Sequence, residues 1–418
     1  MMQKGAVRLA GAVLAGLASV AAAGGSIAMQ VEDAGLTSGR NAQQTAPLPD
    51  IMLRMLPPGT PMPAPQPALS AVERREIGEG LLRTPLDLKL FNLLFADAVR
   101  TGRPDSEIER LAAITRQLGW RYTPAQQNLM LRALLDERFD DVLDHVDALL
   151  RRQKQAALAY TMLSAMEGVP QVHGAVLDKL LARPDWRAAY LAVIGPQSLP
   201  ALLDARVRTL DALLATPSGL TLDELGPSLA ALTASGRGRA AHRLWMRHTQ
   251  EQRTAGGPGG DNAQAGGNLL YDPAFEQLAR RAGGDDLGIP FEWRLGQDLG
   301  YAAQSSSEGV MINWDRRGVP VFLSQTVPVR PGRSYTLTLQ GTTDQDRLGR
   351  LLAPVLLCGT QMVRFVPVGV QAQGPARYRS ESLPDACDMG VLAINGAVDT
   401  GSGPVNIALS HVALQPAR

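Results

Sequence analysis

The sequence predicts a multidomain α + β protein, in which an N-terminal α-solenoid of helical hairpins is followed by an antiparallel β-sandwich. Three observations support this prediction. Residues 70–250 carry apolar side chains three and four positions apart, residues 251–267 are rich in Gly, and after Asn268 the apolar period changes to two. A chain of 418 residues has room for two or three folded units.

The first 29 residues are typical of an exported protein. Lys4 and Arg8 precede a run from Leu9 to Met29 that contains no charged residue. About 21 residues of helix, at ~1.5 Å each, extend about 31 Å, which is enough to cross a bilayer, and the preceding basic residues keep that end inside. We therefore expect a periplasmic protein anchored in the inner membrane by this N-terminal helix. The alternatives are a signal peptide cleaved after Ala21–Ala23, which would release a secreted protein, and a buried helix of the soluble fold.

Residues 30–69 are expected to form a Pro-rich linker. Eight prolines lie from Pro47 to Pro67. Because proline lacks a backbone N–H, neither a regular helix nor a central strand suits this stretch, and we interpret it as a semi-extended spacer.

Helix signals recur over residues 70–250. Thr84–Pro85 and Thr123–Pro124 place Thr at a cap and Pro at the first helical position, and Thr221 followed by Glu224 has the spacing of a capping box. The pattern predicts about ten to twelve helices of roughly 12–16 residues. Short connections make successive helices antiparallel, so we expect stacked helical hairpins.

Three segments resemble the joints between helices in the tetratricopeptide-like (TPR-like) α-solenoid superfamily: Ala133–Asp141, Pro184–Ala189 and Ala234–Ala241. The Trp and Tyr of the usual repeat consensus are absent from the expected places, and no regular period of about 34 residues is present. The resemblance implies a helical repeat domain that binds a protein partner along its concave face.

The Gly-rich stretch 251–267 predicts a flexible linker between two domains. Beyond it, apolar residues recur at every second position, Val327 and Val329 before the turn 330–333 and Tyr335, Leu337 and Leu339 after it. Further strands are predicted at 319–323, 351–358, 363–370, 390–394 and 405–414. Together they amount to one sandwich over residues 268–418.

Three segments of this region resemble galactose-binding-like, carbohydrate-binding jelly rolls: Asn268–Glu276, Leu323–Leu337 and Gly403–Leu414. The middle segment matches a Gln-x-Val, Pro-Gly-x-x-Tyr-x-Leu hairpin of that family. The resemblance implies a jelly-roll fold and glycan binding. It also implies a structural calcium held by Glu276 and a last-strand carboxylate, but Ser410–His411 stands where that carboxylate is common. We expect no other cofactor.

Glycan-binding members of this family stack sugar rings on exposed aromatic side chains. The candidates are Trp314 with its polar neighbours Asn313, Asp315 and Arg316, and the rings of Tyr301 and Trp293. The alternative for each ring is a place in the sandwich core. Trp293 in particular lies between Phe291 and Leu295 at period two.

Cys358 and Cys387 are the two cysteines of the chain, about 29 residues apart. A disulfide between them would stabilise the fold by about 3–4 kcal/mol. The alternative is a pair of buried thiols.

We expect no enzyme, because the sequence has no G-x-S-x-G, H-E-x-x-H, P-loop or C-x-x-C motif. The net charge of +1 argues against nucleic-acid binding. The predicted function is an envelope scaffold, by analogy in surface polysaccharide production or export, with a protein partner on the helical repeats and glycan on the sandwich. The alternatives are a pure protein–protein adaptor and a polysaccharide hydrolase, which would need two facing carboxylates about 5–9 Å apart.

Overall fold

The computed structural model describes residues 68–193, 200–216, 219–254, 267–280, 288–341, 345–368, 375–397 and 403–417. The predicted anchor at 1–29 and the Pro-rich spacer up to residue 67 lie outside these ranges. Within them, no helix is both long and apolar enough to cross a bilayer. The predicted inner-membrane anchor is corrected accordingly, since no described helix provides it, and the periplasmic localisation derived from it is not retained.

The first part of the described chain is helical, as predicted, with eleven α-helices and one π-helical turn up to Thr254. Their bounds are α3 (Ala71–Arg83), α4 (Leu88–Thr101), α5 (Asp105–Leu118), α6 (Thr123–Leu135), α7 (Phe139–Arg151), α8 (Ala156–Glu167), α9 (Pro170–Leu181), α10 (Arg187–Ala192), α11 (Pro200–Leu214), α12 (Leu222–Leu232), η2 (Thr233–Arg237) and α13 (Gly238–Thr254).

Helix caps agree only in part with the sequence signals. Thr221 accepts a hydrogen bond from the Glu224 N–H, and the Glu224 carboxylate accepts one from the Thr221 N–H, so the predicted capping box at α12 is confirmed. The start predicted at Thr84 is wrong, because Thr84 ends α3. Helix α4 begins at Leu88, and the side chain of its N-cap residue Asp87 accepts hydrogen bonds from two backbone N–H groups.

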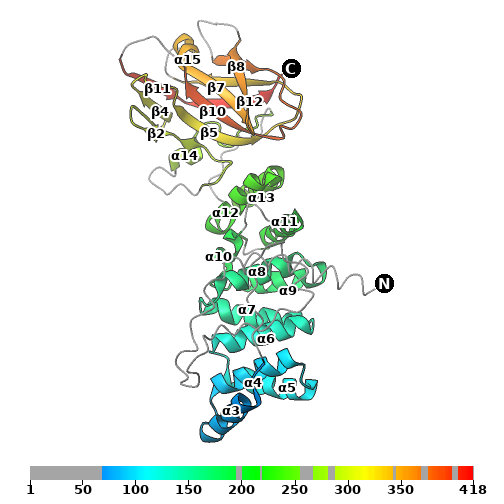
Figure 1. Ribbon diagram of the computed structural model, residues 1–418. Coiled ribbons are helices and arrows are strands. Elements are labelled where there is room, and N and C mark those ends of the chain that lie inside the picture. Colours follow the sequence, from blue (N-terminus) through cyan, green and yellow to red (C-terminus); the bar gives the residue numbers. More distant parts are fainter. Residues whose placement is uncertain are drawn as a thin grey trace. The chain divides into compact units, whose positions relative to one another are not determined.

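Consecutive helices pack in pairs, which is what tight connections require (Figure 1). Apolar faces of α4, α5 and α6 share one buried cluster that includes Phe95, Ile108 and Leu129. These contacts establish helical hairpins, whereas the resemblance to TPR-like repeats stays a prediction. The chain forms two compact units, and within the described residues the first ends at Thr209 and the second runs from Leu210.

Strands follow a short helix in the second unit (Figure 1). The elements are α14 (Glu276–Arg280), β1 (Arg294–Leu295), β2 (Gln297–Asp298), β3 (Tyr301–Ser306), β4 (Gly309–Trp314), β5 (Val321–Pro328), β6 (Tyr335–Gln340), α15 (Gln345–Leu351), β7 (Leu352–Cys358), β8 (Gln361–Pro367), β9 (Ala376–Ser380), β10 (Met389–Gly396), β11 (Val405–Leu409) and β12 (His411–Pro416).

Two antiparallel sheets enclose one core. The larger sheet has the order β1-β5-β10-β7-β8-β9-β6-β12, and the smaller has the order β11-β4-β3-β2. Buried side chains of both sheets, such as Leu356 and Ile394 of the larger and Ile312 and Ile407 of the smaller, belong to the same cluster. The predicted antiparallel sandwich is therefore present.

The hairpin predicted around residues 330–333 is wrong. Val327, Val329, Tyr335, Leu337 and Leu339 are all buried, as their alternation requires. However, β5 pairs with β1 and β10, while β6 pairs with β9 and β12. The turn therefore joins two strands that lie apart in the sheet.

A disulfide joins Cys358, at the end of β7, to Cys387, with the two Cα atoms 5.3 Å apart. Residues 255–266 of the predicted Gly-rich linker lie outside the described ranges, and the linker stays a prediction. Helices α12 and α13 belong to the same compact unit as the strands.

Candidate functional site

Trp314 and Trp293, the two tryptophans predicted to stack on glycan, are core residues of the sandwich. Their assignment to a glycan surface is therefore corrected. Trp314 is 1% exposed, packs edge-on against Phe322 and donates a hydrogen bond to the Arg317 carbonyl. Trp293 is 5% exposed and donates to the Asp272 carbonyl. A ring this deeply buried has no free face on which a sugar can stack.

The other aromatic side chains of the sandwich are placed similarly. Tyr301 is half-buried, with its ring edge-on to Phe322 at 5.8 Å between centroids. All aromatic residues after position 268 lie in the described part of the chain, and none of them is exposed. The sandwich therefore does not present the aromatic platform that the family resemblance implied.

Asn313 is the predicted site residue that does lie on an open surface. Its neighbours Ile312 and Trp314 on β4 point into the core, so Asn313 points out. Directly across the sheet, Asn313 pairs with Asn406 of β11 on one side and with Ala302 of β3 on the other. Gln297 of β2 lies opposite Ala302 and completes the row.

A second row lies beside the first on the same face. Met311 of β4 is flanked by Ala408 of β11 and by Gln304 of β3. We call these seven positions the amide face: Asn313, Asn406, Ala302, Gln297, Met311, Ala408 and Gln304. None of them is charged, and three strand spacings give the face a width of about 14 Å. The strand over 405–414 was predicted, but the alternation of residues predicted neither β2, β3 nor β4, so the pairing that brings the β2, β3 and β11 members beside Asn313 was not foreseen.

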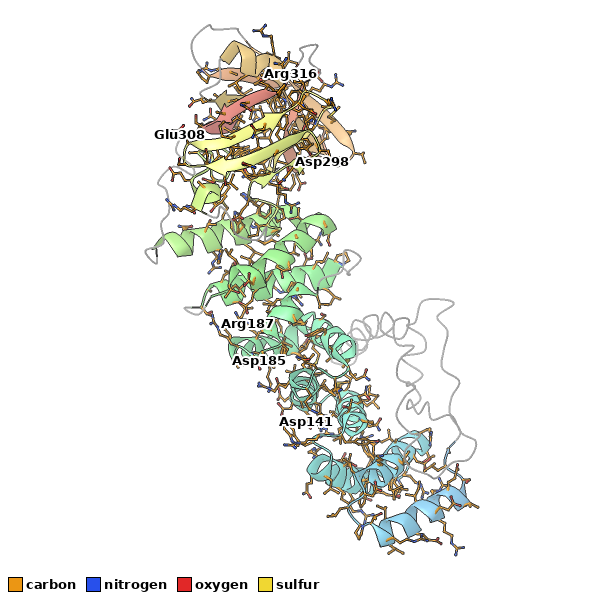
Figure 2. The ribbon with its side chains drawn as sticks, turned by 90° about the vertical axis from the view of Figure 1, so that its left-hand side faces the viewer. Asp141, Asp185, Arg187, Asp298, Glu308 and Arg316 are labelled. Carbon is orange, nitrogen blue, oxygen red and sulfur yellow. A yellow bond between two sulfur atoms is a disulfide. The ribbon has the colours of Figure 1, made fainter. Side chains whose placement is uncertain are left out.

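Asp315 and Arg316 belong to the turn that follows β4, not to the amide face. The Asp315 carboxylate accepts a hydrogen bond from the backbone N–H of Arg317 at 2.8 Å. The backbone N–H of Asp315 donates to the Gly300 carbonyl, also at 2.8 Å. Arg316 has a left-handed backbone at φ 66°. Figure 2 shows Asp298 and Glu308 on opposite sides of the sandwich, as expected for residues at the two ends of β3, with Arg316 on the same side as Asp298. The turn uses the Asp315 carboxylate to hold its own backbone.

The implied calcium does not fit the residues present. The opening segment does lie beside the last strand, since Leu414 donates its N–H to the Asn268 side chain at 3.0 Å. Glu276, however, is half-exposed and faces Arg280 at 3.9 Å. Position 411 carries a histidine, whose pKa is lowered by burial. In the described residues no three His, Cys, Asp or Glu side chains gather as a metal site.

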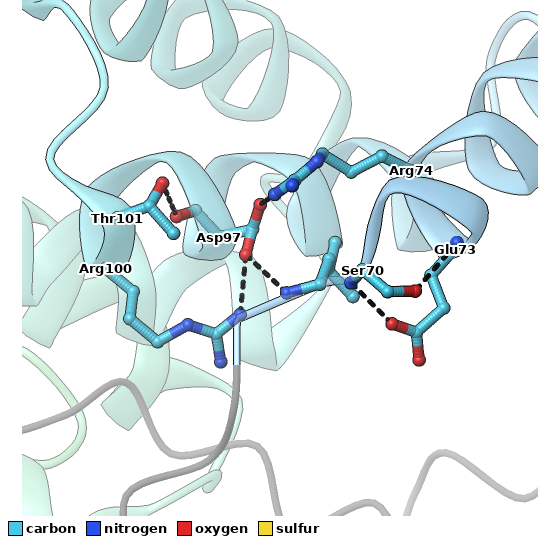
Figure 3. A network of polar contacts seen from close by, with 7 residues as sticks. Ser70, Glu73, Arg74, Asp97, Arg100 and Thr101 are labelled. Atoms are coloured by element: carbon cyan, nitrogen blue, oxygen red, sulfur yellow. Dashed lines mark hydrogen bonds and ion pairs between the residues drawn. The ribbon is translucent and has the colours of Figure 1, made fainter.

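The helical unit has a pocket of about 300 Å³ between α3, α4 and α5. Its deepest polar residue is Asp97, which accepts hydrogen bonds from the Leu69 N–H, from Arg74 and from Arg100 (Figure 3). Burial on its own would raise the pKa of Asp97, but these three donors hold it below its ordinary value.

The rim and wall of this pocket differ in chemistry. Arg103 and Arg110 are exposed at the rim, with Glu107 beside them, and the wall is apolar, with Leu94 and Leu111 among its side chains. An Arg-bearing rim over an apolar wall suits a segment that carries a carboxylate next to an apolar side chain.

No protein-family model matches the sequence, and no curated protein matches it. Among solved structures, the chain is similar to TmCBM61 in complex with β-1,4-galactotriose, at 15% identity over 36% of this chain and 99% of that chain, with a TM-score of 0.22. It is also similar to the enzymatically active domain of bacteriophage CBA120 tailspike protein 4, at 13% identity over 30% of this chain and 18% of that one, with a TM-score of 0.17. Both TM-scores are too low to support an inference about function.

Proposed function

We propose that the protein is a non-enzymatic glycan-binding protein, and that its sandwich holds carbohydrate on the amide face. The observation that carries the proposal is the alignment of Asn406, Asn313 and Gln297 in one row across the smaller sheet. Each amide side chain both donates and accepts hydrogen bonds, which matches the hydroxyl groups of a sugar. The small Ala302 between Asn313 and Gln297, and the small Ala408 beside Asn406 in the second row, leave room for a sugar ring to approach the sheet.

The test is a double substitution on the full chain, Asn313→Ala with Asn406→Ala. We expect it to lower affinity for a bound polysaccharide at least tenfold, because each lost amide removes about 1 kcal/mol of hydrogen bonding. Affinity gel electrophoresis with a panel of neutral and acidic polysaccharides measures this. Gln340→Ala is the matched control, since it removes an exposed amide at the end of β6.

Two outcomes would contradict the proposal. The first is that the wild-type chain migrates equally fast with and without each polysaccharide in the panel, which means that it binds none of them and favours a pure protein–protein adaptor. Alternatively, the double variant would be retarded as strongly as the Gln340→Ala control.

The absence of catalysis is part of the same proposal. It predicts that no new reducing ends form when the protein is incubated with a polysaccharide that it binds. Steady release of reducing ends, lost in an acidic-residue variant, would support the hydrolase instead.

We also propose that the helical unit binds a protein partner at the pocket between α3, α4 and α5. The basic rim at Arg103 and Arg110 supports this, together with the apolar wall below it. Arg103→Glu should weaken binding of peptides that place an acidic residue beside Leu or Phe, measured by fluorescence polarisation. Arg121→Glu, an exposed position outside the pocket lining, should not.

A further inference from the structure

Three arginines share the outer face of the sandwich where β8 pairs with β9. Arg379 of β9 lies directly opposite Val366 of β8, and on its other side it faces Thr336 of β6. Arg377 lies two residues earlier on β9, and Arg364 lies two residues before Val366 on β8. Side chains two apart on a strand point to the same side, so all three guanidinium groups lie on one face.

The buried residues between them fix which face this is. Tyr378, between Arg377 and Arg379, is 1% exposed, and Phe365, next to Arg364, is 6% exposed. Both belong to the sandwich core. The arginines therefore project outward, and all three are exposed. We call Arg364, Arg377 and Arg379 the arginine cluster.

Among the described residues, no acidic side chain forms an ion pair with the arginine cluster. The sequence contains no Asp or Glu between Asp346 and Glu381, and the eight strands of the larger sheet contain none at all. Glu381 follows β9 directly, but in the described residues it forms no ion pair with the cluster. The cluster thus places three cations together on one face of a chain whose net charge is only +1.

Hydroxyl and apolar groups surround the cluster. Thr336 and Thr338 of β6 lie opposite Arg379 and Arg377, respectively. Met362 and Val366 of β8 are 51% and 57% exposed on the same face as Arg364. The surface thus combines planar cationic donors with hydroxyl groups and exposed apolar side chains.

We infer that the arginine cluster binds the carboxylates of an acidic polysaccharide, a polymer that contains uronic acid. This inference rests on the proposed glycan-binding function and adds to the amide face of the smaller sheet a second glycan surface, on the larger sheet, with a named class of ligand. A guanidinium group donates two parallel hydrogen bonds to one carboxylate, the threonine hydroxyls bind neighbouring sugar hydroxyls, and the exposed Met362 and Val366 pack against sugar C–H groups.

A nucleic acid is the other common polyanion, and the surface suits it less well. Single strands are held largely by stacking of bases on exposed aromatic rings. No aromatic side chain of the sandwich is exposed, all of them being described. We therefore assign the cluster to a polymer that needs charge and hydroxyl recognition but no ring stacking.

The experiment measures the affinity of the full chain for polygalacturonate and for the same polymer after its carboxylates are reduced to alcohols. We expect the reduced polymer to bind at least tenfold more weakly. Arg379→Ala should lower affinity for polygalacturonate about tenfold, because a hydrogen bond to a charged group is lost, and should leave the reduced polymer unaffected. Arg379→Lys should also lower the affinity for polygalacturonate several-fold, since lysine keeps the charge but lacks the planar guanidinium group that donates two parallel hydrogen bonds. Arg121→Ala is the control. It removes the same single positive charge from an exposed position on the helical unit and should leave the affinity for polygalacturonate unchanged.

The outcomes separate this inference from the proposed function. Equal affinity for the two polymers, or equal affinity of Arg379→Ala and Arg121→Ala, overturns the acidic ligand while the amide face stands. No binding of either polymer, nor of any neutral glycan, overturns the proposed function as well. Duplex DNA bound as tightly as polygalacturonate at the same salt concentration overturns the assignment to a glycan.

Discussion

Arg206 of α11 and Glu167 of α8 form an ion pair inside the helical unit, with Nη2 and Oε2 3.0 Å apart and side-chain exposures of 3% and 2%. Arg206 also donates to the Tyr190 and Leu191 carbonyls and lies over the Tyr190 ring. The Tyr190 hydroxyl donates to Glu167, and burial followed by the Glu167 charge raises the pKa of Tyr190. Three helices are held together by this one group of charges.

Arg206→Met should therefore destabilise the helical unit by about 3–5 kcal/mol, because it leaves the Glu167 carboxylate buried without its cation. Urea unfolding followed by circular dichroism at 222 nm measures this. The double variant Arg206→Met with Glu167→Leu should recover part of the loss. A double variant that is less stable than Arg206→Met alone would show that the pair itself, and not the orphaned charge, dominates.

Asp97 should make the first helices sensitive to acid. Because its folded pKa is held below the ordinary value, the unfolded chain binds the extra proton. The stability that Asp97 contributes is thus complete well above ~3.9, the ordinary pKa of an aspartate, and is lost as the pH falls through the folded value. The protection of the α3 amides against hydrogen exchange, measured relative to the unfolded chain at the same pH, should fall on acidification, and Asp97→Asn should lower it already at neutral pH. Unchanged exchange in that variant would contradict the role assigned to Asp97.

His242 should give a second acid sensitivity, with a different cause. Burial lowers the pKa of His242 to about 4, and its ring meets Phe291 edge-on at 5.2 Å. The unfolded state therefore binds a proton first, and stability falls as the pH drops from about 6.5 towards 4. His242→Phe keeps an aromatic ring at this place and should flatten the stability profile in that window. An equally steep profile in His242→Phe would assign the effect to other groups.

The disulfide should be the main covalent support of the sandwich. Cys358 and Cys387 are separated by 29 residues, and closing a loop of this length is worth about 3–4 kcal/mol. Replacing both by Ser should lower the unfolding free energy of the sandwich by that amount, measured in guanidinium by the protection of the β7 and β10 amides against hydrogen exchange. The helical unit should keep its own transition at 222 nm. A loss confined to the helical signal would be inconsistent with this placement.

Trp314 and Asn313 are sequence neighbours, but Trp314 points into the sandwich core and Asn313 points out of it, so their substitutions should have different effects. Trp314→Ala removes a ring that is 1% exposed and should cost about 3–5 kcal/mol of stability. Asn313→Ala should leave stability within about 0.5 kcal/mol and reduce glycan affinity. Thermal unfolding and affinity electrophoresis, run on both variants, check the pair. Trp314→Phe, if it folded normally yet lost all binding, would return the ring to the glycan surface.

The alternation of residues predicted which side chains are buried, but not which strands are neighbours. Val327, Val329, Tyr335, Leu337 and Leu339 are buried as predicted, since period two is a local property of a strand. The hairpin between them was wrong because strand pairing depends on contacts far along the sequence. The same rule, applied to Val310, Ile312 and Trp314, would have predicted an inward Trp314 and an outward Asn313.

The candidate sites were visible in the sequence to different degrees. The arginine cluster has a simple signal, namely the absence of acidic residues from Arg347 to Ser380. The amide face has none, because Asn406 and Asn313 become neighbours only through the pairing of β11 with β4. Likewise, the segments around Glu276 and His411 were expected to meet, and they do, but a half-exposed Glu276 beside Arg280 could not be foreseen from residue spacing.

The closing contacts of the sandwich dictate the order in which a newly made chain can fold. Asn268 and Leu269, which open the sandwich, bond to Leu414 of β12, and β12 in turn completes the pairing of β6. Helical hairpins use contacts between near neighbours and can form during synthesis. The sandwich can be completed only after residues 411–416 have been translated, and until then one edge of β6 lacks its partner strand and is open to pairing with other chains.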